Sequence, residues 1–227
     1  MSIAITTPAE RWTQSASRYD RPHLRLRQVA TIVNEYAPAR LLDVGCSAGH
    51  LRLLCPGIEY HGIDFAAAGA QTEFAFTRCD INREPLPDHL RDLPMIVCCG
   101  ALEYVERLDR FLPALRERLA PGGRLLATYY NMNHLSRLWA MLRGRSFWVH
   151  PDWRGFHSPA RVRELIESSG FEVERVQPTW HSAAPSPRIE QTVDLPLIFP
   201  RWNPLSALLS HQFIYVARRA FPNKSSS

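Results

Sequence analysis

The residues best suited to chemistry lie in one short stretch, in which a carboxylate and two glycines follow an apolar run. Leu41 and Leu42 lead into Asp43, and Gly45 and Gly49 follow it. A strand that turns over glycines into a helix leaves backbone N–H groups at its mouth, and glycine has no Cβ to keep a ligand away. At the carboxyl end of a parallel sheet, a crevice of this kind binds nucleotide-like ligands. A carboxylate at the turn favours a ligand with a cationic amine over a polyphosphate.

The spacing of this turn argues against two common nucleotide motifs. The dinucleotide fingerprint G-x-G-x-x-G needs a middle glycine, and this chain has Ser47 there. The phosphate-binding pattern G-x-x-x-x-G-K-S/T is absent, and the only lysine is Lys224. A ligand with an amino-acid end and an adenosine end fits the turn, and S-adenosylmethionine is such a ligand.

The stretch resembles motif I of the class I S-adenosylmethionine-dependent methyltransferases, whose core pattern is D/E-x-G-x-G-x-G. The resemblance extends over about residues 24–218, and Pro121-Gly122-Gly123 resembles the family's helix stop before the fifth strand. It implies S-adenosyl-L-methionine as the cofactor. The cofactor contacts that we expect come from Asp43, Gly45, Cys46, Gly49, Asp64, Phe65, Asp80, Ile81, Cys99, Gly100 and Glu103.

Two further acids end predicted strands in the positions that an adenosine needs. Asp64 ends the predicted strand 60–64, about twenty residues past the turn, where an acid accepts from both ribose hydroxyls. NAD-binding proteins share this feature. Asp80 and Ile81 match the family's adenine-binding position, although Asp80 can instead be a turn residue.

Two other segments resemble the family outside motif I. Leu102-Glu103 follows the apolar strand 94–99 and resembles the family's L-E-H segment, with Tyr104 where histidine is usual. Tyr19 matches an aromatic position that can close over the methionine end of the cofactor, and its alternative is a hydrophobic anchor. The base-amine pattern D/N/S-P-P-Y/F/W is absent, so a nucleic-acid substrate is disfavoured.

The periodicity and the resemblance together predict an α/β fold. The resemblance implies that this fold is a Rossmann-like seven-stranded sheet of order 3-2-1-4-5-7-6, with the last strand antiparallel and helices on both faces. Helical spacing of apolar residues predicts a helix over 24–36 and another over 108–119. The later elements are a helix after Ser158-Pro159 and strands over 171–177 and 212–218. Residues 1–227 are expected to form one domain, with an N-terminal arm (1–23) and a polar tail (221–227).

The segment 131–157 is rich in Trp, His and Arg, and we expect it to form a lid over the acceptor. Its helix, 134–142, is expected to pack on the sheet edge, while 144–157 shapes the acceptor pocket. If the acceptor is a hydroxyl, His157 and His134 are the leading candidates for a general base, because histidine titrates in the right range.

Composition limits the remaining possibilities. The chain has 227 residues, 45% of them hydrophobic, and a formal charge of +5 that comes almost entirely from arginine. The arginines at 21, 25 and 27 are expected on a solvated helix face. Five cysteines without a C-x-x-C pair support neither a disulfide framework nor a zinc site. No signal peptide or membrane-spanning run is predicted, and a cytoplasmic location fits best.

The resemblance implies methyl transfer to an oxygen, nitrogen or carbon of a small-molecule acceptor. A non-catalytic cofactor-binding protein would bind S-adenosylhomocysteine but have no acceptor pocket. An RNA methyltransferase would show salt-dependent RNA affinity, and an NAD-dependent enzyme lacks support in the fingerprint. No catalytic metal is expected, and the oligomeric state stays open.

Overall fold

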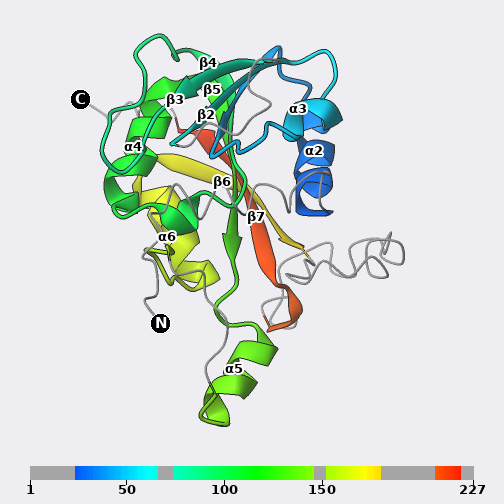
Figure 1. The fold of residues 1–227 in the computed structure, drawn as a ribbon, viewed down its shortest axis with the longest axis vertical. Helices are drawn as coiled ribbons and strands as arrows, with labels where there is room; N and C mark the ends of the chain where they lie inside the picture. Colours follow the sequence, from blue (N-terminus) through cyan, green and yellow to red (C-terminus); the bar gives the residue numbers. More distant parts are fainter. Residues whose placement is uncertain (1–23, 66–73, 146–151, 180–207, 221–227) are drawn as a thin grey trace, which may run out of the picture.

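The computed structural model describes residues 24–65, 74–145, 152–179 and 208–220. Its centre is a seven-stranded sheet of order β3-β2-β1-β4-β5-β7-β6 (Figure 1). Strand β7 runs antiparallel to β5 and β6, and the other neighbours are parallel. The strands are β1 (Arg40–Val44), β2 (Glu59–Asp64), β3 (Ala75–Arg78), β4 (Leu93–Cys98), β5 (Leu119–Tyr130), β6 (Phe171–Thr179) and β7 (Gln212–Arg219). The predicted order and the antiparallel last strand are confirmed.

The helices cover both faces of the sheet (Figure 1). The helical elements of the described residues are α2 (Leu24–Tyr36), α3 (Leu51–Leu54), the 3-10 turn η3 (Leu102–Tyr104), α4 (Leu108–Arg118), α5 (Leu135–Leu142) and α6 (Pro159–Ser168). Helices α2 and α3 lie on one face, and α4 and α6 lie on the other.

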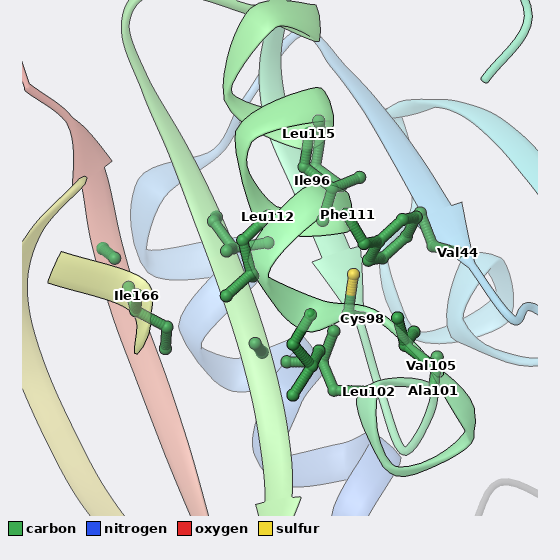
Figure 2. Close-up of a cluster of buried hydrophobic side chains, with 14 of the residues drawn as sticks. Val44, Ile96, Cys98, Ala101, Leu102, Val105, Phe111, Leu112, Leu115 and Ile166 are labelled. Atoms are coloured by element: carbon green, nitrogen blue, oxygen red, sulfur yellow. The ribbon is translucent and has the colours of Figure 1, made fainter. Parts of the chain in front are cut away.

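Alternate residues along the central strands enter two separate hydrophobic cores. In β4, Ile96 and Cys98 pack toward α4 and α6, whereas Met95 and Val97 pack toward α2. Figure 2 shows the first core, in which Phe111 and Leu112 of α4 lie over β4. A strand that is covered on both faces must be apolar at every position, which is why 95–99 forms an unbroken apolar run.

Most element boundaries differ from the predictions by one or two residues. The exception is β5, which begins at Leu119 because Leu119 already pairs with Leu93 of β4, so Pro121-Gly122-Gly123 lies inside the strand and not before it. Strand β6 continues to Thr179 and β7 to Arg219, because the two strands pair with each other along these residues. Strand β3 ends at Arg78. The short helix expected after Ala66 lies outside the described residues, as do the arm (1–23) with Tyr19, the tail (221–227) and residues 146–151 of the lid segment.

The expectation that the helix over 134–142 packs on the sheet edge is wrong for the described part of the chain. Helix α5 begins one residue later than expected, with His134 as its N-cap, and none of its residues is buried. It begins where β5 ends and projects beyond the end of the sheet (Figure 1). Its first turn is held to the body of the domain, because the ring of His134 stacks on His211 and the guanidinium of Arg137 donates to the carbonyl of Asn131. Among the described residues, no helix is long and apolar enough to cross a membrane.

Candidate active site

The glycine turn after β1 has the backbone that its sequence predicts. Gly45 and Gly49 have φ angles of +72° and +70°, and Ser47 between them has +50°. A Cβ on Gly45 would lie 2.8 Å from the Cβ of Ala101, and one on Gly49 would lie 2.6 Å from the ring of Phe74. Both glycines are therefore required by backbone conformation and by close packing.

Asp64 joins the end of β2 to this turn. Its Oδ2 atom accepts a hydrogen bond from the backbone N–H of Ser47 at 2.9 Å. The turn is also held by Ile63, whose carbonyl accepts from the N–H of Gly45 at 2.8 Å. The structure thus brings together the turn and the acid that the sequence places about twenty residues apart.

Asp43, the acid of β1, is buried beneath the turn. Its side chain is 2% exposed, and its Oδ2 atom accepts a hydrogen bond from the hydroxyl of Tyr60 at 2.7 Å. Burial raises the pKa of the Asp43 carboxyl to about 7, the Tyr60 hydroxyl opposes this shift, and the charge of Asp64 adds to it. A cation close to Asp43 would favour its ionised form.

Asp80 closes the turn after β3. Its Oδ1 atom accepts from the N–H of Asn82 at 3.0 Å, and its carbonyl accepts from the next two N–H groups. Ile81 packs partly buried against the core. Asn82, which the sequence analysis did not single out, bonds the carbonyl of Tyr104 and the N–H of Glu106. The loop after β3 is therefore fastened to the loop after β4.

Cys99 and Gly100 lie at the carboxyl end of β4. Cys99 is buried, and the N–H of Gly100 donates to the hydroxyl of Thr128 at 2.8 Å. Gly100 has a φ angle of +76°, and a Cβ there would lie 2.5 Å from a guanidinium nitrogen of Arg25. The guanidinium of Arg25 thus lies against the end of β4.

Arg25 corrects the expectation that the arginines of this helix lie on a solvated face. Its side chain is half-buried, and its charge lowers the pKa values of Cys99 and Glu103 against the larger effect of burial. The sequence did hold a signal, because Arg25 lies four residues before the buried Val29 and therefore on the same face of the helix.

Two other predicted cofactor residues line the same end of the sheet. Cys46 is buried directly after Gly45, with its Sγ atom 2.6 Å from the position of a Cβ on Gly62. Phe65 follows Asp64, and its carbonyl accepts from Arg78 at 3.2 Å.

Glu103 connects the ends of β4 and β5. Its side chain is 1% exposed, and its Oε1 atom accepts from the N–H of Tyr130 at 2.8 Å. Its carbonyl accepts from the N–H groups of Arg154 and Gly155 at 2.8 and 3.3 Å. Burial raises the pKa of the Glu103 carboxyl to about 7, and Arg25 opposes the shift. The segment after residue 151 is therefore anchored over the end of β4.

Aromatic side chains gather beside Glu103. The rings of Tyr130 and Trp153 lie 4.6 Å apart, and Phe156 lies 6.4 Å from Trp153. Arg137 lies over the ring of Tyr130 at 5.4 Å. We call Tyr130, Trp153 and Phe156 the aromatic wall. Such a surface can stack on a flat or ring-shaped molecule.

The two candidate bases occupy different surroundings. His157 is half-buried beside Tyr129, with ring centroids 6.0 Å apart, and burial lowers its pKa, as does the charge of Arg161. His134 is the N-cap of α5: its Nδ1 atom accepts from the N–H of Ser136, and its ring stacks on His211 at 3.9 Å.

These groups suit the parts of S-adenosylmethionine. Carboxylates end β1 and β2 and follow β3, and a guanidinium lies against the end of β4. An ammonium, a ribose diol and an adenine amino group each need an acceptor, and a carboxylate needs a cationic donor. The described residues contain no group of side chains that could hold a metal ion.

A doubly wound sheet of this strand order, with a glycine turn after its first strand, defines the class I methyltransferase fold. Residues 12–176 match the family model described as a methyltransferase domain, and the chain belongs to that family. The protein is an S-adenosylmethionine-dependent methyltransferase.

The comparisons also give more distant similarities. The chain is 22% identical over 166 residues to a ubiquinone biosynthesis O-methyltransferase of Rickettsia bellii (strain OSU 85-389), covering 67% of this chain and 69% of that one. It is 25% identical over 162 residues to the tRNA N(3)-cytidine methyltransferase METTL2 of Danio rerio, covering 60% and 46%. The solved 1,6-didemethyltoxoflavin-N1-methyltransferase of Burkholderia thailandensis shares the fold, with a TM-score of 0.63, 13% identity and coverage of 97% and 94%.

Proposed function

We propose that this methyltransferase acts on a small, ring-containing acceptor held between Glu103 and the aromatic wall. The single observation that carries the proposal is the position of Tyr130, Trp153 and Phe156 beside the carboxyl ends of β4 and β5. The similarity to a ubiquinone biosynthesis enzyme, and to a toxoflavin enzyme solved with 1,6-didemethyltoxoflavin and S-adenosylhomocysteine, supports this acceptor class.

The cofactor would be held by groups of opposite charge at its two ends. We assign the ribose hydroxyls to Asp64, the ammonium to Asp43 and the carboxylate to Arg25. Asp80 and Ile81 would take the adenine, and Tyr19 would cover the methionine end. The remaining walls of the cofactor site would be Gly45, Cys46, Gly49, Phe65, Cys99, Gly100 and Glu103.

When bound, S-adenosylmethionine supplies a methyl group activated on a sulfonium. The chain contributes alignment and exclusion of water. A hydroxyl acceptor must also lose its proton, and we assign His157 as the general base that accepts it. Its lowered pKa keeps the imidazole neutral at pH 7, the form that accepts a proton. His134 is the weaker candidate, because its ring caps α5 and stacks on His211.

The contacts of residues 152–157 support one part of the lid assignment. We propose that these residues border the acceptor, because the backbone N–H groups of Arg154 and Gly155 donate to the carbonyl of Glu103.

We also propose that residues 1–227 form one domain and that the enzyme is cytoplasmic. All five cysteines are buried and free, as expected in a reducing compartment.

The test measures methyl transfer from tritiated S-adenosylmethionine to three acceptor sets: hydroxylated aromatic rings, nitrogen heterocycles and tRNA. We expect transfer to a ring compound, lost in Trp153→Ala and kept in the surface control Leu53→Ala. Calorimetry with S-adenosylhomocysteine and with NAD accompanies it. Transfer to tRNA alone would support the RNA alternative. Cofactor binding without transfer to any set would support a non-catalytic protein.

A further inference from the structure

In the part of the chain that the structure describes, the exposed large apolar side chains are concentrated on α5. Among the described residues, seven large hydrophobic side chains are exposed, and four belong to this helix of eight residues: Leu135, Trp139, Met141 and Leu142. They are between 50% and 80% exposed. An apolar patch of this kind on the surface of a folded domain marks an interaction site.

The apolar residues form one stripe along the helix. Leu135, Trp139 and Leu142 follow one another at intervals of four and three residues, so they lie on one face. Figure 1 shows that this helix projects beyond the end of the sheet. Two other exposed hydrophobic side chains lie near its base, because Phe156 packs near Trp153 and Leu208 precedes the His211 that stacks on His134.

The base of α5 is fixed to the domain. The ring of His134 stacks on His211 at the start of β7, and the guanidinium of Arg137 donates to the carbonyl of Asn131. The side-chain amide of Asn131 donates to the carbonyl of Ser210 at 2.7 Å. The helix is therefore held at its first turn and presents the stripe outward from there.

The charged side chains of the segment that carries the stripe have one sign. The sequence contains no Asp or Glu between Glu117 and Asp152. Arg143 and Arg145 are exposed at the carboxyl end of the helix, and the Arg143 guanidinium lies 4.5 Å over the ring of Trp139. A second copy of α5 would bring no carboxylate to these arginines. An anionic lipid surface would supply phosphates for the guanidinium groups and an acyl boundary for the leucines.

We propose that α5 docks this protein on an anionic membrane surface. Leu135, Trp139 and Leu142 would enter the interface between headgroups and acyl chains, and Arg143 and Arg145 would contact lipid phosphates. The helix would lie in the membrane plane and not cross it. Tyr130 of the aromatic wall lies beneath the guanidinium of Arg137, which belongs to the first turn of α5, and its ring lies beside Trp153. Docking through α5 would therefore bring the acceptor site close to the lipid.

The test is co-sedimentation of the full chain with phosphatidylcholine vesicles, with and without about 30% phosphatidylglycerol. We expect binding that is at least about tenfold stronger to the anionic vesicles and weakened by about 0.5 M salt. Trp139→Ser with Leu142→Gln should abolish it, and Arg143→Gln with Arg145→Gln should remove the preference for anionic lipid. The matched controls are Leu53→Gln and the pair Arg27→Gln with Arg110→Gln, all exposed positions outside α5.

Two kinds of result would overturn the proposal. No binding to either vesicle, or equal binding by the α5 variants, would remove the membrane as partner. Wild-type protein that sediments as a dimer without vesicles, and becomes a monomer in Trp139→Ser with Leu142→Gln, would assign the stripe to a second copy. Calorimetry with S-adenosylhomocysteine checks that every variant is folded, and a protein that binds vesicles but methylates no ring compound would refute only the proposed acceptor.

Discussion

The carboxylate of Asp64 accepts the backbone N–H of Ser47 at 2.9 Å, which fastens the end of β2 to the glycine turn after β1. Ser47 lies in the turn after β1 and Asp64 ends β2, the parallel neighbour of β1, so the bond fixes the acid beside the turn. A carboxylate held in this way is positioned before a ligand arrives, so little ordering cost is left for binding.

Replacement of Asp64 tests the cofactor site. Asp64→Ala should weaken S-adenosylhomocysteine binding about tenfold to a hundredfold, because a hydrogen-bonded partner is removed at about 1–3 kcal/mol. Calorimetry measures the loss, and Asp109→Ala, a surface acid on α4, is the control. Equal affinities for the two variants would contradict the assignment of the ribose to Asp64.

Arg25 is expected to recognise the amino-acid end of the cofactor. Arg25→Gln should lower the affinity for S-adenosylhomocysteine at least about tenfold, the scale of one charged hydrogen bond. It should leave the affinity for methylthioadenosine unchanged, because that ligand has no carboxylate. Arg27→Gln, an exposed position on the same helix, is the matched control. A parallel loss for both ligands would indicate a general structural role for Arg25.

Gly45 and Gly57 form a matched pair for the cost of a Cβ. Both have positive φ angles, but a Cβ on Gly45 meets Ala101 at 2.8 Å, whereas one on Gly57 meets nothing within 4 Å. Gly57→Ala should therefore lower the free energy of unfolding by only about 1–2 kcal/mol, the cost of placing a residue with a Cβ in the left-handed conformation. Gly45→Ala should cost about 1–3 kcal/mol more through overpacking. Chemical denaturation measures both, and equal losses would show that Ala101 yields without cost.

The buried Asp43 predicts a pH dependence of stability. Its pKa is raised from 3.8 to about 7 in the folded chain, so between about pH 4 and pH 7 the unfolded chain releases a proton that the folded chain keeps. The free energy of unfolding should therefore fall as the pH rises through this window. One pKa unit corresponds to about 1.4 kcal/mol, so the effect is a few kcal/mol.

The Asp43→Asn variant isolates this contribution. The difference in unfolding free energy between wild type and variant should move in favour of the variant from pH 4 to pH 8. Glu103, whose pKa is also raised to about 7, is present in both proteins and cancels. Parallel curves for the two proteins would mean that Asp43 is ionised in the folded chain.

If His157 is the general base, its protonation should cause kcat/KM to fall at low pH; we call this fall the acid limb of the pH profile. Because burial lowers its pKa, kcat/KM for a hydroxyl acceptor should fall only below the usual range of a histidine, as the imidazole becomes protonated. His157→Gln should lower kcat/KM and remove this limb. His134→Gln should instead disturb the start of α5 and keep the limb. A profile unchanged in His157→Gln would exclude the assignment of His157 as the base.

Local patterns in the sequence were enough to predict the central strand and the glycine turn of this protein. The apolar run before Gly100 predicted a central strand, and the glycines at 45 and 49 predicted a turn, because both signals depend on residues that are neighbours in the chain. The strand order followed from the resemblance to a family, and the structure confirms it.

Tertiary structure decided the contacts that complete the site. Arg25 reaches Gly100, Glu103 accepts from Tyr130, and Asn82 bonds two residues of the loop after β4. Each pair is separated by more than twenty positions, and no local periodicity encodes such a contact. For α5 the local pattern predicted the bounds of the helix to within one residue, whereas the direction of the helix depended on which side chains hold its first turn. Hydrophobic spacing determines that a face is apolar, but only the assembled chain determines what that face meets, because burial depends on residues distant in sequence.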